Sequence, residues 1–158
     1  MEQHIIDILL GQKPAEYILQ VLNRLMEADQ YLLEIDVNER SITHRLAIYL
    51  QEIFDDWHVD CEYNRDGNDP KELYFPSDPG DVADTDARTV FPDIIIHERG
   101  TGNNYVVIEV KKSTSVVGGE WDREKLTRYR NQLGYRFALF VEFDTGHGQQ
   151  GIHQLYWV

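Results

Sequence analysis

Apolar residues recur along this chain with two different periods, which divide it into predicted helices and strands. Spacings of three and four residues predict a helix over 14–30. Its repeated apolar positions are Ile18, Val21, Leu22, Leu25 and Met26. A short helix is expected before it, over 2–10, because Gly11 and Pro14 interrupt the pattern between the two. The chain therefore opens with two predicted helices.

The helical period returns over about 38–55, where Asn38 is the expected N-cap. The apolar positions of this helix are Ile42, Leu46, Tyr49, Leu50, Ile53 and Phe54. Glu39 precedes Ile42 by three residues and so lies on the extension of the buried stripe. By the same spacing, His44 does not share a face with Glu39 and is expected at the surface.

Strands follow this helix. Alternation predicts a strand over 58–64, and continuous apolar runs predict strands over about 91–98, 105–111 and 137–143. The turn at 100–104 is short enough to join 91–98 and 105–111 as an antiparallel hairpin.

The remaining segments complete a mixed pattern. Residues 65–89 are rich in Asp, Gly and Pro, which predicts a long loop with a short strand around 73–75. A helix is expected over 120–134 and a last strand near 152–158. The order of elements predicts a single α/β domain over 1–158. It would consist of a helical addition at 1–30, a core at 38–143 and an extra strand within 150–158.

Composition agrees with a globular chain, because 42% of the 158 residues are hydrophobic and 27% are charged. The single cysteine, Cys61, cannot form an internal disulfide and favours a reduced, cytoplasmic setting. The first residues lack the features of a signal peptide, and no apolar run is long enough to cross a bilayer, so no membrane partner is expected.

The net charge of −13 argues against a protein that coats DNA nonspecifically. The charge is uneven, however, because 111–136 holds seven Lys and Arg against three Asp and Glu. This basic strip suits a protein that meets an anion at one face, although a solvated amphipathic helix would look the same.

Three charged residues interrupt the two most apolar segments. Asp93 and Glu109 lie on strands joined by a short turn, which places them opposite or diagonal to each other, with Cβ atoms about 5 Å apart if directly opposed. Lys111 shares a face with Glu109, whereas Val110 points into apolar packing. Burying two carboxylates costs several kcal/mol, which a divalent cation offsets. Simpler interpretations are a turn role for Asp93 and an ion pair between Glu109 and Lys111.

These residues resemble a known family. Pro92 and Asp93, followed by Glu109-Val110-Lys111, look like the signature of the PD-(D/E)XK nuclease superfamily, and the elements over 38–143 are similar to its α-β-β-β-α-β core. The resemblance implies a restriction-endonuclease-like fold with a mixed central sheet and two extra N-terminal helices. It also implies hydrolysis of nucleic-acid phosphodiesters with Mg²⁺, for which Mn²⁺ would substitute.

The resemblance also assigns roles. Asp93, Glu109, the Val110 carbonyl and Glu39 would hold the metal, and Lys111 would be the catalytic lysine. Four further residues are candidates for substrate binding, either directly or through the catalytic lysine: Lys112, Ser113, Lys125 and Gln132.

The expected partner is nucleic acid, with DNA favoured over RNA. The resemblance also implies a homodimer or a partner subunit. Two other functions remain open. One is a catalytically silent module of this fold that binds protein or nucleic acid. The other is an acidic mimic of nucleic acid, which only the net charge suggests.

Overall fold

The computed structural model describes residues 14–76, 85–146, 148 and 150–158. Its centre is a sheet of five strands in the order β1-β6-β7-β8-β9. The strands are β1 (His58–Cys61), β6 (Ile94–His97), β7 (Asn104–Lys112), β8 (Phe137–Asp144) and β9 (Gly151–Trp157). β7 and β8 are parallel and the other neighbours antiparallel, so the sheet is mixed. The parallel pair requires a crossover, which helix α5 (Glu120–Leu133) supplies.

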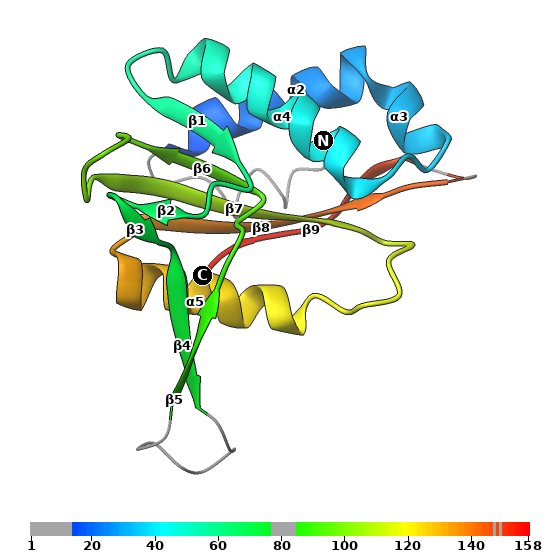
Figure 1. The fold of residues 1–158 in the computed structure, drawn as a ribbon. Helices are drawn as coiled ribbons and strands as arrows, with labels where there is room; N and C mark the ends of the chain where they lie inside the picture. Colours follow the sequence, from blue (N-terminus) through cyan, green and yellow to red (C-terminus); the bar gives the residue numbers. More distant parts are fainter. Residues whose placement is uncertain (1–13, 77–84, 147, 149) are drawn as a thin grey trace.

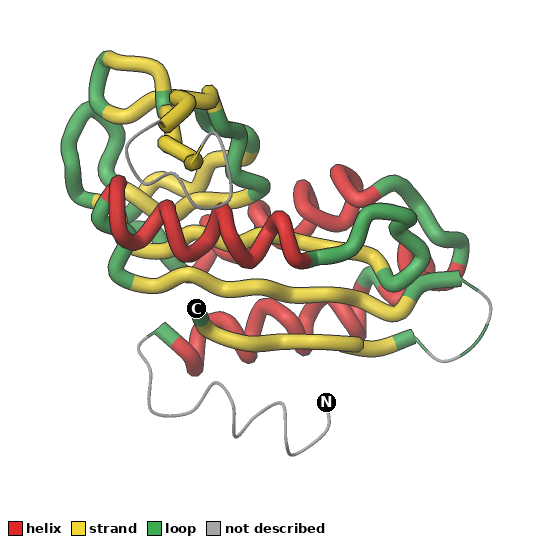
Figure 2. Tube along the Cα trace, turned by 90° about the horizontal axis from the view of Figure 1, so that it is seen from below, coloured by secondary structure: helices red, strands yellow, loops and turns green. Residues whose placement is uncertain are grey.

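Helices cover both faces of this sheet (Figure 1). One face packs against α2 (Ala15–Ala28), α3 (Gln30–Glu34) and α4 (Glu39–Ile53), and α5 lies across the other, as Figure 2 shows from below. In β7 the apolar side chains alternate between two cores, because Ile108 packs with the α2 and α4 residues while Val107 packs with those of α5. Burial on both faces explains why β6 and β7 are almost continuously apolar. The same alternation turns Glu109 and Lys111 toward α5.

The start of α4 is fixed by a side-chain cap. Asn38 Oδ1 accepts a hydrogen bond from the Ser41 N–H at 2.9 Å, so the predicted N-cap is confirmed. Glu39 is therefore the first helical residue, beside the end of β7. Within the described ranges, no helix combines the length and the apolar character that crossing a bilayer demands.

The long loop predicted over 65–89 was wrong for the described part of that segment, but the short strand predicted around 73–75 is confirmed, because a strand spans Glu72–Pro76. Two small antiparallel hairpins occupy it: β2 (Arg65–Asp66) with β3 (Asp69–Pro70), and β4 (Glu72–Pro76) with β5 (Thr85–Thr89). The second hairpin projects past α5 (Figure 1). It forms because Leu73 and Phe75 are buried in the α5 core, a tertiary contact that the local composition does not reveal.

The other predicted elements differ mainly at their ends. The helix predicted over 14–30 ends at Ala28, and the separate short α3 was not expected. The strands predicted over 58–64 and 91–98 are shorter, and β6 begins only at Ile94. The helix over 120–134 and the strands over 105–111, 137–143 and 152–158 are confirmed within about two residues. The helix predicted over 2–10 lies outside the described residues.

Lys71, between the two small hairpins, is a buried cation outside the acidic region. It is 0% exposed, its Nζ donates to the Tyr135 hydroxyl at 2.6 Å, and it lies over the Tyr63 ring. Burial lowers its pKa from 10.5 to about 8, against the opposing attraction of Asp66 and Asp60. Charging this amine in the folded state therefore costs about 3 kcal/mol.

The Lys71→Met variant tests this cost. Between about pH 8 and 10.5 the unfolded chain binds more protons at Lys71 than the folded chain does, so the free energy of unfolding rises with pH. We expect urea unfolding to show the wild type gaining up to about 3 kcal/mol relative to Lys71→Met across this range. A difference between the two proteins that is independent of pH would contradict the assignment.

Candidate acidic site

Two carboxylates meet where β6 begins and β7 ends. The register pairs Ile94 with Ile108, which brings Asp93 opposite Glu109. Asp93 Oδ2 accepts a hydrogen bond from the Val110 N–H at 2.8 Å, so the backbone of β7 holds this side chain in place. The two carboxyls are close enough for Asp93 to raise the pKa of Glu109. The structure thus brings together the two acids that the sequence analysis placed side by side.

Glu109 is the most deeply buried of the acids, with 1% of its surface exposed. Its Oε2 accepts a hydrogen bond from Lys125 Nζ at 2.8 Å, whereas its Oε1 is buried without a hydrogen-bond partner. Burial raises the pKa of Glu109 well above its ordinary value, and Asp93 adds to this effect. A buried, unpartnered carboxylate oxygen costs free energy, and a cation is the kind of partner that removes the cost.

Asp93 is less enclosed but is also affected by its surroundings. Burial raises its pKa, and the hydrogen bond from the Val110 N–H opposes this. Both acids of the pair therefore hold a proton more readily than they would in water.

Two lysines, one from β7 and one from α5, lie beside this pair of acids. A third acid pairs with both lysines. Asp122, in the first turn of α5, is 7% exposed and forms ion pairs with Lys125 at 2.9 Å and with Lys111 at 3.3 Å. Burial lowers the pKa of Lys125, but its pairs with Glu109 and Asp122 outweigh burial and raise the pKa above its usual value. Lys125, predicted to bind substrate, is thus part of the charged group itself.

Asp122 was not among the site residues predicted from the sequence. A signal was present, because an acid three residues before a lysine on a helix forms a favourable pair. What the sequence does not give is the phase of α5 relative to β7, which turns both members of that pair toward Lys111 and Glu109.

Glu39 reaches the same region from α4. It is half-buried, and its Oε2 accepts a hydrogen bond from the Lys112 N–H at 3.2 Å. Burial raises the pKa of Glu39, and Lys111 opposes the increase. Among the residues that the structure describes, no three Asp, Glu, His or Cys side chains are close enough to hold one ion. The tight pair is Asp93 and Glu109, and Glu39 lies apart from it.

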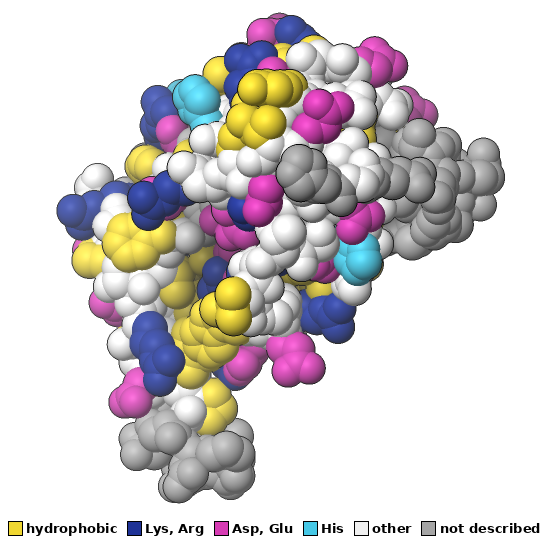
Figure 3. Space-filling model, turned by 90° about the vertical axis from the view of Figure 1, so that its right-hand side faces the viewer, with side chains coloured by type: hydrophobic (Ala, Val, Ile, Leu, Met, Phe, Trp, Pro, Cys, Tyr) yellow, Lys and Arg dark blue, Asp and Glu magenta, His cyan; other side chains and the backbone are white. Residues whose placement is uncertain are grey.

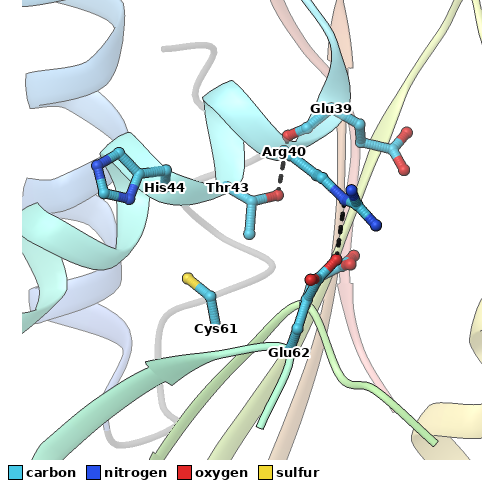
Figure 4. A pocket seen from close by; sticks show the side chains of 7 residues that line it. Glu39, Arg40, Thr43, His44, Cys61 and Glu62 are labelled. Atoms are coloured by element: carbon cyan, nitrogen blue, oxygen red, sulfur yellow. Dashed lines mark hydrogen bonds and ion pairs between the residues drawn. The ribbon is translucent and has the colours of Figure 1, made fainter.

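A cavity of about 290 Å³ is shared by Glu39 and Asp93 but not by Glu109. Its lining, drawn in Figure 4, comprises Glu39, Arg40, Thr43, His44, Cys61, Glu62 and Asp93. Figure 4 shows His44 and Glu39 leaving α4 in different directions, as expected, although both line the cavity. Arg40 lies between them and pairs with Glu62 at 3.0 Å across its mouth. Asp93 and Glu39 therefore open onto one shared space.

The remaining predicted residues have other partners. Lys112 Nζ donates to Asp36 Oδ1 at 2.8 Å and to the Val37 carbonyl at 2.7 Å, which ties β7 to the segment before α4. Gln132 bonds both backbone groups of Tyr74. Exposed Ser113 accepts from the Thr145 N–H at 3.3 Å. Lys112 and Gln132 thus hold the fold together instead of facing the carboxylates.

The charges of the cluster do not balance. Asp93, Glu109, Asp122 and Glu39 face only two ammonium groups, those of Lys111 and Lys125. When all are ionised, the cluster carries two excess negative charges, the charge of one divalent cation, although no three of these acids are close enough to hold one ion. The unpartnered Glu109 oxygen and this excess both fit a hard cation with oxygen ligands.

No family model, curated protein or solved structure matches this chain. The chemistry of the site therefore follows from its own residues.

Proposed function

We propose that this protein is a metal-dependent nuclease that hydrolyses phosphodiester bonds of nucleic acid. The observation that carries the proposal is the buried, unpartnered Oε1 of Glu109 next to Asp93, with Lys111 on the same side of β7. Two acids and a lysine at the end of two paired strands are the groups that this reaction needs.

The order of elements supports the proposal. Helix α4, strands β1, β6 and β7, helix α5 and strand β8 follow one another as in an α-β-β-β-α-β core, with the two small hairpins inserted after β1. A restriction-endonuclease-like fold is therefore part of the proposal.

Each residue has a role in this mechanism. Asp93, Glu109 and the Val110 carbonyl would hold Mg²⁺ or Mn²⁺, with Glu39 on the cavity side, and the ion would supply a Lewis acid and an activated water. Lys111, anchored by Asp122, would stabilise the negative charge that develops on the phosphate. Lys125, which pairs with Glu109 and Asp122, would offset part of their negative charge while no metal is bound. The substrate would be DNA in preference to RNA, and a second copy or a partner subunit would complete its binding.

The second candidate is a silent module of the same fold that binds protein or nucleic acid. One observation favours it: Lys125 already provides Glu109 with a counter-charge at 2.8 Å. In that case the ion pair would be permanent and metal would have no effect.

Cleavage is the direct test. Asp93→Asn removes a negative ligand and Lys111→Ala removes the ammonium, so each should lower the initial rate of Mg²⁺-dependent cleavage at least about 100-fold. The rate is measured on single-stranded and duplex DNA. Glu98→Gln is the matched control, because Glu98 is an exposed acid in the turn at the other end of the β6–β7 hairpin. Undiminished cleavage in both site variants would exclude this site.

The pH dependence of Mn²⁺ binding is a second test. Burial raises the pKa of both Glu109 and Asp93, so protons compete with the ion at higher pH than they would at carboxylates in water. Calorimetry should show affinity rising with pH, by up to about tenfold per pH unit for each proton released. Asp93→Asn should abolish the binding, and pH-independent binding would argue against these two ligands.

Removing Lys125 separates the two candidate functions. Lys125→Met leaves Glu109 buried without a counter-charge, which should lower the free energy of unfolding by about 3–5 kcal/mol in EDTA. If the pair binds a dication, Mn²⁺ should raise the melting temperature of this variant more than that of the wild type. Equal Mn²⁺ effects on both proteins would favour the silent module.

A further inference from the structure

An aromatic and basic surface lies where α5 meets the projecting β4–β5 hairpin. We name it the aromatic wall and define it by Phe75, Arg88, Trp121 and Arg128. The rings of Phe75 and Trp121 stack with centroids 4.7 Å apart and an interplanar angle of 27°. The Arg88 guanidinium lies 5.6 Å from the first ring and 5.8 Å from the second. Arg128 lies 4.6 Å from Phe75. The wall thus consists of two stacked rings with two guanidinium groups close to them.

The two rings of the wall differ in their exposure to solvent. Phe75 is 3% exposed and forms its base, whereas Trp121 is 40% exposed although Phe75 stacks on it. Figure 3 shows hydrophobic side chains gathered at the base of the hairpin, with both basic and acidic side chains beside them. Arg128 is paired with Glu124 at 2.7 Å, but no carboxylate of the described residues pairs with Arg88. Arg88 therefore carries a positive charge that no acid of the described residues neutralises.

Hydrogen bonds hold the wall rigid. The Tyr74 N–H donates to Gln132 Oε1 at 2.8 Å, and Arg128 Nη1 donates to the Tyr74 carbonyl at 2.8 Å. Both contacts join the backbone of β4 to α5. A surface fixed in this way loses little conformational entropy when a ligand binds.

The wall is adjacent to the acidic site. Trp121 directly precedes Asp122, the acid that pairs with both Lys111 and Lys125. The same short segment of α5 thus presents an exposed ring and anchors the two lysines. A ligand lying on Trp121 would have one end close to the catalytic groups of the proposed nuclease.

We propose that the aromatic wall binds an unpaired segment of the nucleic-acid substrate, with a base stacked on Trp121 and a phosphate paired with Arg88. The inference rests on the proposed nuclease function, for which it names the substrate class. Exposed aromatic rings bind unpaired bases by stacking, worth about 1–3 kcal/mol per base, and duplex bases are not available to them. A guanidinium held over a ring can pair with a phosphate at the same time. On a protein with net charge −13, such a local cation is needed to attract a polyanion.

The test is binding in EDTA, where metal-dependent cleavage cannot occur. Fluorescence anisotropy compares labelled oligothymidylate, oligouridylate and a DNA duplex of equal length. We expect the single strands to bind more tightly than the duplex, and Trp121→Ala and Arg88→Met each to weaken single-strand binding about tenfold. Tryptophan fluorescence should be quenched on binding in the wild type and much less in Trp121→Ala.

Three variants make the result interpretable. Tyr31→Ala, which removes an exposed ring on α3 across the sheet, should bind like the wild type. Trp121→Phe should recover most of the affinity lost in Trp121→Ala, which excludes a folding defect. Glu98→Gln should also retain binding in EDTA, because Glu98 is exposed in the turn at the other end of the β6–β7 hairpin.

The outcomes separate this inference from the nuclease proposal. Tighter duplex binding, or unchanged affinity in Trp121→Ala, would overturn the wall, whatever the result of the cleavage assays. Wall-dependent binding without metal-dependent cleavage would support the wall and overturn the nuclease. Comparison of the two single strands decides between DNA and RNA.

Discussion

The structure depends on compensation for one buried charge. Glu109 lies in β7, the middle strand of the five, where its carboxylate is 1% exposed. An unpaired carboxylate at such a position costs several kcal/mol, so its partner has to be held as firmly as the acid itself. Lys125 is that partner, and the position of α5 allows the Lys125 ammonium to reach Glu109. The ion pair thus adds an electrostatic constraint to the apolar packing of Leu126 and Tyr129 under the helix.

This constraint connects the two sides of the sheet. Val110, next to Glu109, packs into the core under α2 and α4, while its N–H donates to Asp93. The Lys112 N–H donates to Glu39 on α4. Successive residues of one strand end therefore bind α5, the start of β6 and the start of α4. That arrangement gathers acids from three elements without a dedicated loop.

Much of this arrangement could be predicted from the sequence, because it depends on short-range rules. Strand alternation separates Val110 from Glu109 and Lys111, and the short turn between β6 and β7 sets Asp93 opposite Glu109. Asn38 caps α4 through its own side chain. These features involve residues near each other in the chain or joined by a short turn.

The features that could not be predicted depend on how separate elements pack. Asp122 and Lys125 join the site because α5 lies on the sheet in one rotation about its axis, which its mostly polar sequence leaves open. The β4–β5 hairpin forms because Leu73 and Phe75 find a buried place against α5, although the surrounding composition is typical of a loop. The partners of Lys112 could not be predicted for the same reason, because Asp36 and Val37 are distant from it in sequence.

The positions of the cavity and the wall limit how a substrate could use both. The cavity lies between α4, the end of β1 and the residue before β6, where Asp93 and Glu39 line it. The wall lies on the α5 side, beginning at Trp121. Since α4 and α5 cover opposite faces of the sheet (Figure 1), a ligand that touches both must cross the sheet end where β7 finishes. Lys111 is the next-to-last residue of β7, and its side chain points toward α5. It lies at this end of the sheet, where its ion pair with Asp122 holds it. A flexible unpaired strand can follow such a bend around a sheet edge, whereas a stiff duplex of the same length would have to be deformed.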